Sequence, residues 1–211
     1  ESGQLYVGGQ DEFGILESDV QGRPSYKSLT HLVPEALKSF EDIWQIFIQD
    51  NSVYFCSERA VFMLKDSSIT VISPESGKFE NFFKVNDKLY LQDKALGIFE
   101  VSGSRLQSVP GGNFYPSQRI ISMLPYKDGE ILVITAGKGL FLLNSEGLSP
   151  LATTASPFLI QNLPYCAIAL SNGNYAIGTA QNGLLIIDRE GNPVSHLNTS
   201  RGLQNNTILS L

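Results

Sequence analysis

The sequence predicts an all-β fold, a β-propeller of four-stranded blades, and three observations support this prediction. One block of strand, short polar loop, small residue and second strand recurs along the 211 residues. The 19 glycines and 10 prolines supply many turns, which favours short strands over long helices. Apolar residues make up 42% of the chain and charged residues 17%, as in packed globular domains.

The recurring block can be aligned on the small residue that precedes its second strand. In chain order it reads LYVGGQDEFGILES (5–18), VYFCSERAVFMLKD (53–66), LYLQDKALGIFEVS (89–102), ILVITAGKGLFLLN (131–144) and YAIGTAQNGLLIID (175–188). The small residues are Gly14, Ala60, Gly97, Gly139 and Gly183. We expect a residue with little or no side chain where the chain passes closely from one strand to the next.

Further apolar segments surround each block and complete a unit of four short strands. A third strand of the block is expected in SSITVIS (67–73), SRLQSVP (104–110), GLSPLAT (147–153) and NPVSHLN (192–198). A first strand is expected in IWQIFIQD (43–50), ENFFKVND (80–87), RIISMLPYKDG (119–129) and YCAIALSNG (165–173). The DN, ND, KDG and SNG turns that follow these first strands consist of residues that accept positive φ in hairpins. Four strands in about 40 to 50 residues is typical of a propeller blade.

The unit boundaries predict about five blades. The units span roughly 1–42, 43–79, 80–118, 119–161 and 162–201, and residues 202–211 begin a sixth. Because both ends fall inside a unit, we expect part of a larger propeller; a closed five-blade ring and a β-sandwich are the alternatives, although a sandwich would not explain the repeat. Residues 19–42 are expected to be a loop insertion, in which VPEALKSF could form one or two helical turns.

Charge and composition exclude several classes of function. The formal net charge is −6 and the basic residues form no run, so the chain lacks the electrostatic footprint of a nucleic-acid-binding protein. The apolar stretches are strand-length, which predicts no transmembrane helix within the chain. Cys56 and Cys166 each lie in an apolar strand-like run and are expected to be buried thiols.

The sequence contains no catalytic, metal or cofactor motif. His31 and His196 lie in separate loop contexts without cysteine or glutamate at metal-ligand spacing, so we expect no metal and no cofactor. A glycoside hydrolase is the enzymatic alternative, because many of these are propellers with carboxylates at the axis. The expected inner strands IWQIFI, NFFKV, RIISML and YCAIAL carry almost no acids, which predicts a non-enzyme.

Candidate ligand-binding residues come from the loops expected on one face of the propeller. The loops between the second and third strands hold Gln10, Asp11, Glu12, Ser57, Glu58, Arg59, Asp93, Lys94, Lys138, Gln181 and Asn182. Where first strands begin, the chain carries Trp44, Tyr115, Arg119 and Tyr165. Aromatic faces beside Arg, Asn and Gln suit a sugar, through stacking and hydrogen bonds. The predicted binding set is Trp44, Arg59, Lys94, Tyr115, Arg119, Lys138, Tyr165, Gln181 and Asn182.

The last unit resembles the two-component-regulator propeller repeat, which has a Gly-Leu strand, an Asp-x-x-Gly turn, and a Gly-Leu-x-x-Asn segment before a β-branched strand. The matching residues are Gly183-Leu184, Asp188 with Gly191, and Gly202-Leu203 with Asn205, Asn206 and Thr207. GKGLFLLNSEG (137–147) and the strand pair GEILVITAGKGLF also match, and residues 8–47 resemble early blades of such sensors from Bacteroidetes-type bacteria. The resemblance is specific in the last 80 residues and weak in 65–118.

The resemblance implies a periplasmic sensor domain of a membrane-anchored regulator. In that family a small β-sandwich, a transmembrane helix and a kinase or DNA-binding output part follow the propeller, so any contact with the membrane would come through a tether outside this chain. The ligands that the family implies are often glycan fragments, so an oligosaccharide is the expected partner. The alternative is an interaction or dimerisation propeller without a small-molecule ligand. In either case the open sheet edges could pair with another copy to form a homodimer.

Overall fold

The computed structural model describes residues 4–75, 77–113 and 118–211, and these residues form five antiparallel sheets in chain order. The first sheet contains β1 (Leu5–Gly9), β2 (Glu12–Ser18) and β3 (Pro24–Ser28); the second contains β4 (Gln45–Gln49), β5 (Ser52–Cys56), β6 (Val61–Lys65) and β7 (Ser68–Ile72). The third contains β8 (Phe79–Val85), β9 (Lys88–Asp93), β10 (Gly97–Ser102) and β11 (Arg105–Ser108). The fourth contains β12 (Ile120–Pro125), β13 (Ile131–Thr135), β14 (Gly139–Asn144) and β15 (Gly147–Pro150), and the fifth β16 (Pro164–Ala169), β17 (Tyr175–Thr179), β18 (Leu184–Ile187) and β19 (Pro193–Leu197).

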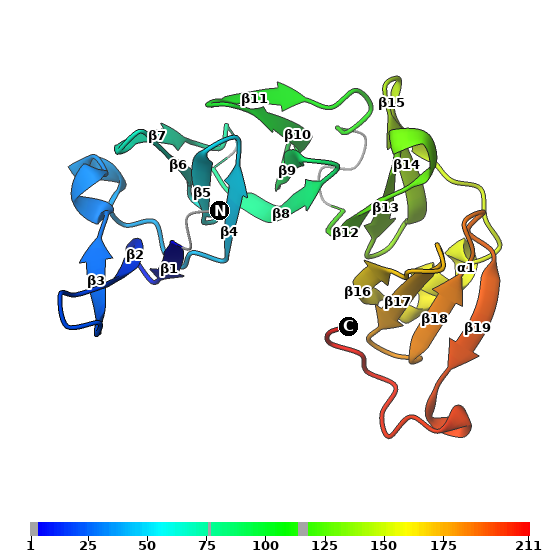
Figure 1. Cartoon of the computed structure of the whole chain (residues 1–211). Helices are drawn as coiled ribbons and strands as arrows, with labels where there is room; N and C mark the ends of the chain where they lie inside the picture. The colour runs from blue at the N-terminus through cyan, green and yellow to red at the C-terminus, as the bar shows by residue number, and fades with distance from the viewer. Residues whose placement is uncertain (1–3, 76, 114–117) are drawn as a thin grey trace.

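The sheets follow one another along an open arc, with β1–β3 at one end and β16–β19 at the other (Figure 1). Each sheet is a meander in which consecutive strands pair, so the first strand of each four-stranded sheet lies at one edge. β12 contacts both β8 and β16, which makes these first strands the inner strands of the arc. This arrangement confirms the predicted propeller of about five blades.

The second strands of the four-stranded sheets are buried almost throughout. Because alternate residues of a strand point to opposite sides, one such strand can contribute to two apolar clusters. On β13, Ile131 and Val133 pack in a cluster with the third sheet, whereas Leu132 and Ile134 pack in a cluster with the fifth. β5 and β9 likewise each contribute residues to two clusters, one on either side of the sheet. Each of the four apolar clusters therefore lies in a seam between two neighbouring sheets.

The turns that join inner and second strands have the backbone conformation that the sequence predicted. Asp50 and Asn51 have φ of 49° and 58°, and Asn86 and Asp87 have 50° and 55°. These are left-handed conformations that Asn and Asp tolerate better than most residues. The result confirms the hairpin assignment of the DN and ND turns.

A buried polar residue closes the loop between the second and third strands in four sheets, and we call it the clasp residue. The clasp residues are Ser57, Asp93, Thr135 and Thr179, all buried. The hydroxyl of Thr179 donates to the carbonyl oxygen of Gly183 (2.9 Å) and accepts the backbone N–H of Asn182 (3.0 Å). Thr135 and Ser57 make the corresponding bonds, and Asp93 accepts two backbone N–H groups of its loop.

The structure confirms the expected reason for a small residue at three of the five recurring positions, and it gives a different reason at a fourth. Gly97, Gly139 and Gly183 have φ of 99°, 81° and 73°, and a Cβ on Gly183 would lie 2.1 Å from the carbonyl oxygen of Leu197. Gly14 is different, because it pairs with Val7 two residues beyond the turn between β1 and β2, and its φ is not positive. A Cβ there would meet the carbonyl oxygen of Lys27 at 2.2 Å, so Gly14 is required by a close approach of β3.

Residues 19–42 contain more structure than the predicted loop insertion. Residues 24–28 form β3, and two short 3-10 helices follow, η1 (Thr30–Leu32) and η2 (Glu35–Leu37). Val33 and Phe40 are buried in the seam between the first two sheets, where Phe40 lies 4.7 Å from Phe62 between ring centroids. The segment was mistaken for an insertion because its apolar residues are widely spaced among polar ones.

Two other segments differ from the sequence prediction or extend it. A helix, α1 (Ser156–Asn162), precedes β16 and buries Leu159 against the fifth sheet, and a further 3-10 turn, η4 (Thr199–Arg201), follows β19. Residues 203–211 form no strand, but the backbone N–H of Ile208 donates to the carbonyl oxygen of Thr179, as that of Ile43 does to Gly9. The C-terminal residues therefore begin like a sixth unit.

The two cysteines lie in unlike environments. Cys56 is fully buried, as predicted, and burial raises the pKa of its thiol. Cys166 is only half-buried, and its Sγ lies 3.6 Å from the carbonyl oxygen of Ile208. The prediction of two buried thiols is therefore wrong for Cys166, because it lies on the inner strand of the last described sheet.

Substitution of Gly183 tests the requirement for a residue without Cβ. Gly183→Ala should cost about 3 kcal/mol of unfolding free energy, because strain at positive φ adds to the collision with the carbonyl oxygen of Leu197. Gly22 is the comparison: its φ is 76°, but a Cβ added there would have no atom within 4 Å. Gly22→Ala should therefore cost only about 1 kcal/mol of unfolding free energy. Urea unfolding measures both, and equal losses would contradict the close-approach explanation.

Candidate functional site

Three of the four inner strands have a bulge near their first residue. In the pairing of β8, β12 and β16 with their second strands, the register shifts across Glu80, Ile121 and Tyr165 respectively. On β4, Trp44 precedes the regular pairing and occupies the corresponding place, since Ile43 and Phe79 both donate their N–H to the preceding sheet. Bulges re-aim side chains and are frequent beside binding sites.

A cleft of about 400 Å³ lies where three of these inner strands begin. It is lined by Trp44, Gln45, Glu58, Glu80, Asn81, Phe82 and Arg119. Trp44 and Gln45 come from the start of β4, Glu80 to Phe82 from the bulged start of β8, and Arg119 directly precedes β12. The repeat thus brings the beginnings of three successive inner strands around one cavity.

Trp44 gives the cleft an aromatic surface. Its side chain is 63% exposed, although it is the largest apolar residue in the chain and its only tryptophan. Exposed large aromatic groups in a concave site can stack on the apolar face of a ligand. Gln45, Asn81 and Arg119 add hydrogen-bond donors around this surface.

Ion pairs stabilise the loops at the rim of the cleft. Lys78 Nζ lies 2.8 Å from Glu58 Oε2, and the hydrogen bond to this carboxylate raises the pKa of Lys78. Arg59 lies 2.6 Å from Glu41, on the same loop as Glu58. These pairs are exposed, so they orient side chains more than they stabilise the fold.

The cleft brings two of the predicted binding residues together, Trp44 and Arg119. Arg59 pairs with Glu41 beside the cleft without lining it. The cleft is not lined by Lys94, Lys138, Gln181 or Asn182, which lie in loops of the third, fourth and fifth sheets. Tyr165 occupies the bulge of β16 with 47% exposure. Tyr115 lies outside the described residues.

The candidate set omitted Gln45, Glu58, Glu80, Asn81 and Phe82. Glu58 lies in one of the loops expected on the binding face, but the predicted binding set does not include it. Glu80 falls inside the expected first-strand segment ENFFKVND (80–87), but the inner-strand sequence NFFKV, from which the acid content was judged, begins at Asn81. An alignment of the units on their first strands gives Glu80 the position in the repeat that Trp44 and Tyr165 hold in theirs.

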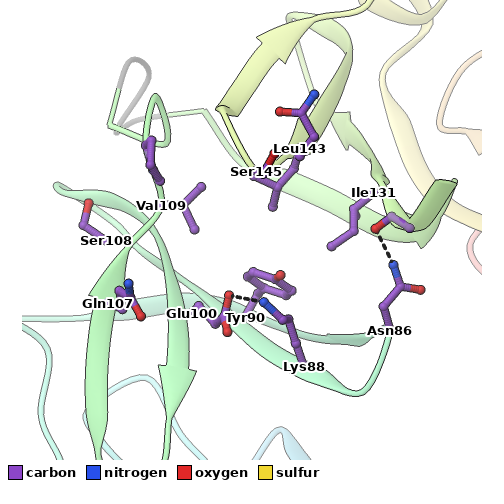
Figure 2. A pocket seen from close by; sticks show the side chains of 13 residues that line it. Asn86, Lys88, Tyr90, Glu100, Gln107, Ser108, Val109, Ile131, Leu143 and Ser145 are labelled. Atoms are coloured by element: carbon purple, nitrogen blue, oxygen red, sulfur yellow. Dashed lines mark hydrogen bonds and ion pairs between the residues drawn. The ribbon is translucent and has the colours of Figure 1, made fainter. Parts of the chain in front are cut away.

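A second cleft of about 400 Å³ lies between the third and fourth sheets and contains none of the predicted residues (Figure 2). Lys88 pairs with Glu100 at 3.0 Å beside Tyr90, whose pKa is raised to about 12 by burial and then by the charge of Glu100. An equivalent cleft lies between the first two sheets, with Tyr6 and Ile15 at the positions of Tyr90 and Glu100. The recurrence marks these clefts as features of the seams.

The described residues contain no group of three or more His, Cys, Asp or Glu that could hold a metal ion. His196 Nε2 lies 2.7 Å from the carbonyl oxygen of Asn182, and His31 lies near the first seam, so neither lines the Trp44 cleft. No helix among the described residues is long and apolar enough to cross a membrane.

No protein-family model and no curated protein matches the chain, but solved structures do. The WD40 β-propeller domain of Doa1 is 14% identical, with a TM-score of 0.65 over 98% of this chain and 67% of that chain. The extracellular domain of the putative one component system BT4673 from B. thetaiotaomicron is 16% identical, with a TM-score of 0.65 over 98% of this chain and 28% of that chain. Virginiamycin B lyase from Staphylococcus aureus is 11% identical, with a TM-score of 0.61 over 93% of this chain and 67% of that chain.

These identities are low, so the likenesses show the β-propeller fold alone. The neighbours include both an extracellular domain of a regulator and an enzyme. The chain spans little more than a quarter of the regulator domain that it resembles.

Substitution of Glu58 tests the geometry of the rim. Glu58→Gln should return the pKa of Lys78 toward its ordinary value, because the carboxylate is the first cause of its increase. Glu80→Gln removes a carboxylate of the same cleft that is not paired with Lys78, and should leave this pKa unchanged. NMR titration of the lysine Nζ resonances measures both, and a pKa of Lys78 that is the same in the wild type and Glu58→Gln would contradict the pairing.

Proposed function

We propose that this chain is the ligand-binding sensor domain of a bacterial transmembrane signalling regulator, and that it binds a glycan fragment without transforming it. The observation that carries the proposal is the cleft in which exposed Trp44 lies among Gln45, Asn81, Arg119 and two glutamates. An aromatic platform stacks on the C–H face of a sugar, and the surrounding amide, guanidinium and carboxylate groups bond its hydroxyls.

Structural likeness to an extracellular regulator domain supports the sensor role and a periplasmic location. In this proposal the propeller would lie outside the cytoplasmic membrane and report ligand binding to an output part elsewhere in the protein. The resemblance of residues 182–211 to the two-component-regulator propeller repeat is in keeping with this placement.

Binding without catalysis fits the side chains of the cleft. The lining contains no histidine, cysteine or serine, and Glu58 is paired with Lys78. Glycoside hydrolysis requires one protonated carboxyl group and one ionised carboxylate on either side of the bond. The Glu58 carboxylate already forms an ion pair with Lys78, so it is engaged by a neighbouring side chain and is not free to act on a glycosidic bond.

An interaction propeller is the second candidate, and exposed apolar side chains on the inner strands favour it. Ile48 on β4 and Ile168 on β16 are 55% and 38% exposed. Such side chains near the two ends of the arc could bind another protein or a second copy. In this case Trp44 would contact a protein partner.

Screening the 211-residue chain against oligosaccharides tests the sensor proposal. One glycan class should raise the melting temperature, since binding to the native state stabilises it by mass action. Trp44→Ala should weaken this binding about tenfold or more. Lys94→Gln, on a loop of the same face but outside the cleft, is the matched control and should bind as the wild type does.

Failure to find a shift with any glycan in the folded chain would contradict the proposal. If a glycan does bind, equal affinities of the wild type and Trp44→Ala would show that the binding site lies outside this cleft.

A further inference from the structure

One buried side chain beside the cleft departs from the repeat. The residue before the clasp is Cys56, Ile134 or Gly178 in three sheets, but it is Gln92 in the third sheet. Gln92 is 1% exposed. A buried amide costs free energy unless its polar atoms are bonded, so its partners indicate what it contributes.

Gln92 bonds the backbone on both sides of Arg119. Its Oε1 accepts the N–H of Ile120 at 2.9 Å, and its Nε2 donates to the carbonyl oxygen of Gln118. Asn81, which lines the cleft, donates to the carbonyl oxygen of Ile120 at 3.0 Å. Gln92 therefore bonds both peptide groups that flank Arg119, and Asn81 bonds the peptide group that follows them.

Other seams make the corresponding connection through the backbone. Ile43 donates its N–H to the carbonyl oxygen of Gly9, Phe79 to that of Glu58, and Ile208 to that of Thr179. Ile120 instead donates its N–H to the side chain of Gln92, so the two peptide groups next to Arg119 are bonded to the third sheet by one side chain. A small cavity of about 20 Å³ lined by Gln92, Gln118 and Ile120 leaves room for this segment to move if the amide is removed.

We propose that Gln92 is a positioning residue that holds Arg119 at the cleft beside Trp44. It contacts no ligand itself and acts through the two peptide groups next to Arg119. The consequence for glycan binding rests on the proposed function, whereas the placement of Arg119 can be tested without any ligand.

Trp44 is the only tryptophan, so its fluorescence reports on this cleft alone. Quenching by iodide at constant low ionic strength depends on nearby positive charge, whereas quenching by neutral acrylamide depends on access. Arg119→Gln should lower the iodide quenching constant to roughly half and leave acrylamide quenching unchanged. Gln92→Leu should have the same effect, and the double variant should show no further decrease.

A purely structural role for Gln92 predicts a different result. Thr179→Val removes buried hydrogen bonds in the fifth sheet, away from the cleft, and serves as the control for general destabilisation. It should leave both quenching constants at the wild-type value. If Gln92→Leu does not fold, Gln92→Asn retains the amide on a shorter side chain that cannot bridge both partners, and it should give an intermediate iodide constant.

Wild-type iodide quenching in folded Gln92→Leu or Gln92→Asn, with a decrease in Arg119→Gln, would overturn the positioning role. Unchanged quenching in Arg119→Gln would overturn it equally, because Arg119 would then not lie beside Trp44. With a glycan found by screening, the affinity losses of Gln92→Leu and Arg119→Gln should not add. Absence of any glycan ligand would defeat the proposed function and leave the quenching result standing.

Discussion

The structure depends on one constraint: a four-stranded sheet of this composition has two apolar faces, and only neighbouring sheets can cover both. On β13, Val133 faces the third sheet and Leu132 the fifth, so one strand contributes to two clusters. The sheets must therefore stack in series, and the chain needs compact loops that bring each meander against the next. The clasp residues and the left-handed turns supply these loops, and the buried clasp hydroxyl groups are hydrogen-bonded within them.

The candidate site is a product of this stacking. Inner strands begin side by side, and their shared bulge directs side chains out of the regular pleat. Trp44 and Glu80, at two of these positions, are not part of the apolar clusters, whereas Ile121 on β12 packs against the cluster between the fourth and fifth sheets. In the second and third sheets the chain places Trp44 and Glu80 at these positions, and Arg119, directly before β12, completes the cleft with Gln92 buried beside its backbone.

The repeated features of the structure could be predicted from the sequence, whereas the features that occur in a single sheet could not. Repeated apolar strands and Asn or Asp turns predicted the blades, because pattern and turn chemistry are local. The register of Gly14 was misjudged because a glycine can be required by φ or by a neighbouring strand, and only the pairing of β1 with β2 distinguishes the two. Gln92 and Glu80 were missed since burial and bulges depend on contacts between sheets. Trp44 and Arg119 were found, but their proximity to each other could not be.

The most direct test uses Val133 and Leu132, which are adjacent, fully buried and on opposite faces of β13. Each substitution with alanine should cost about 2 to 4 kcal/mol. Native-state hydrogen exchange should then show Val133→Ala lowering protection in β8–β11 as well as β12–β15, and Leu132→Ala lowering it in β12–β15 and β16–β19. Loss of protection confined to the fourth sheet in both variants would contradict stabilisation through shared seams.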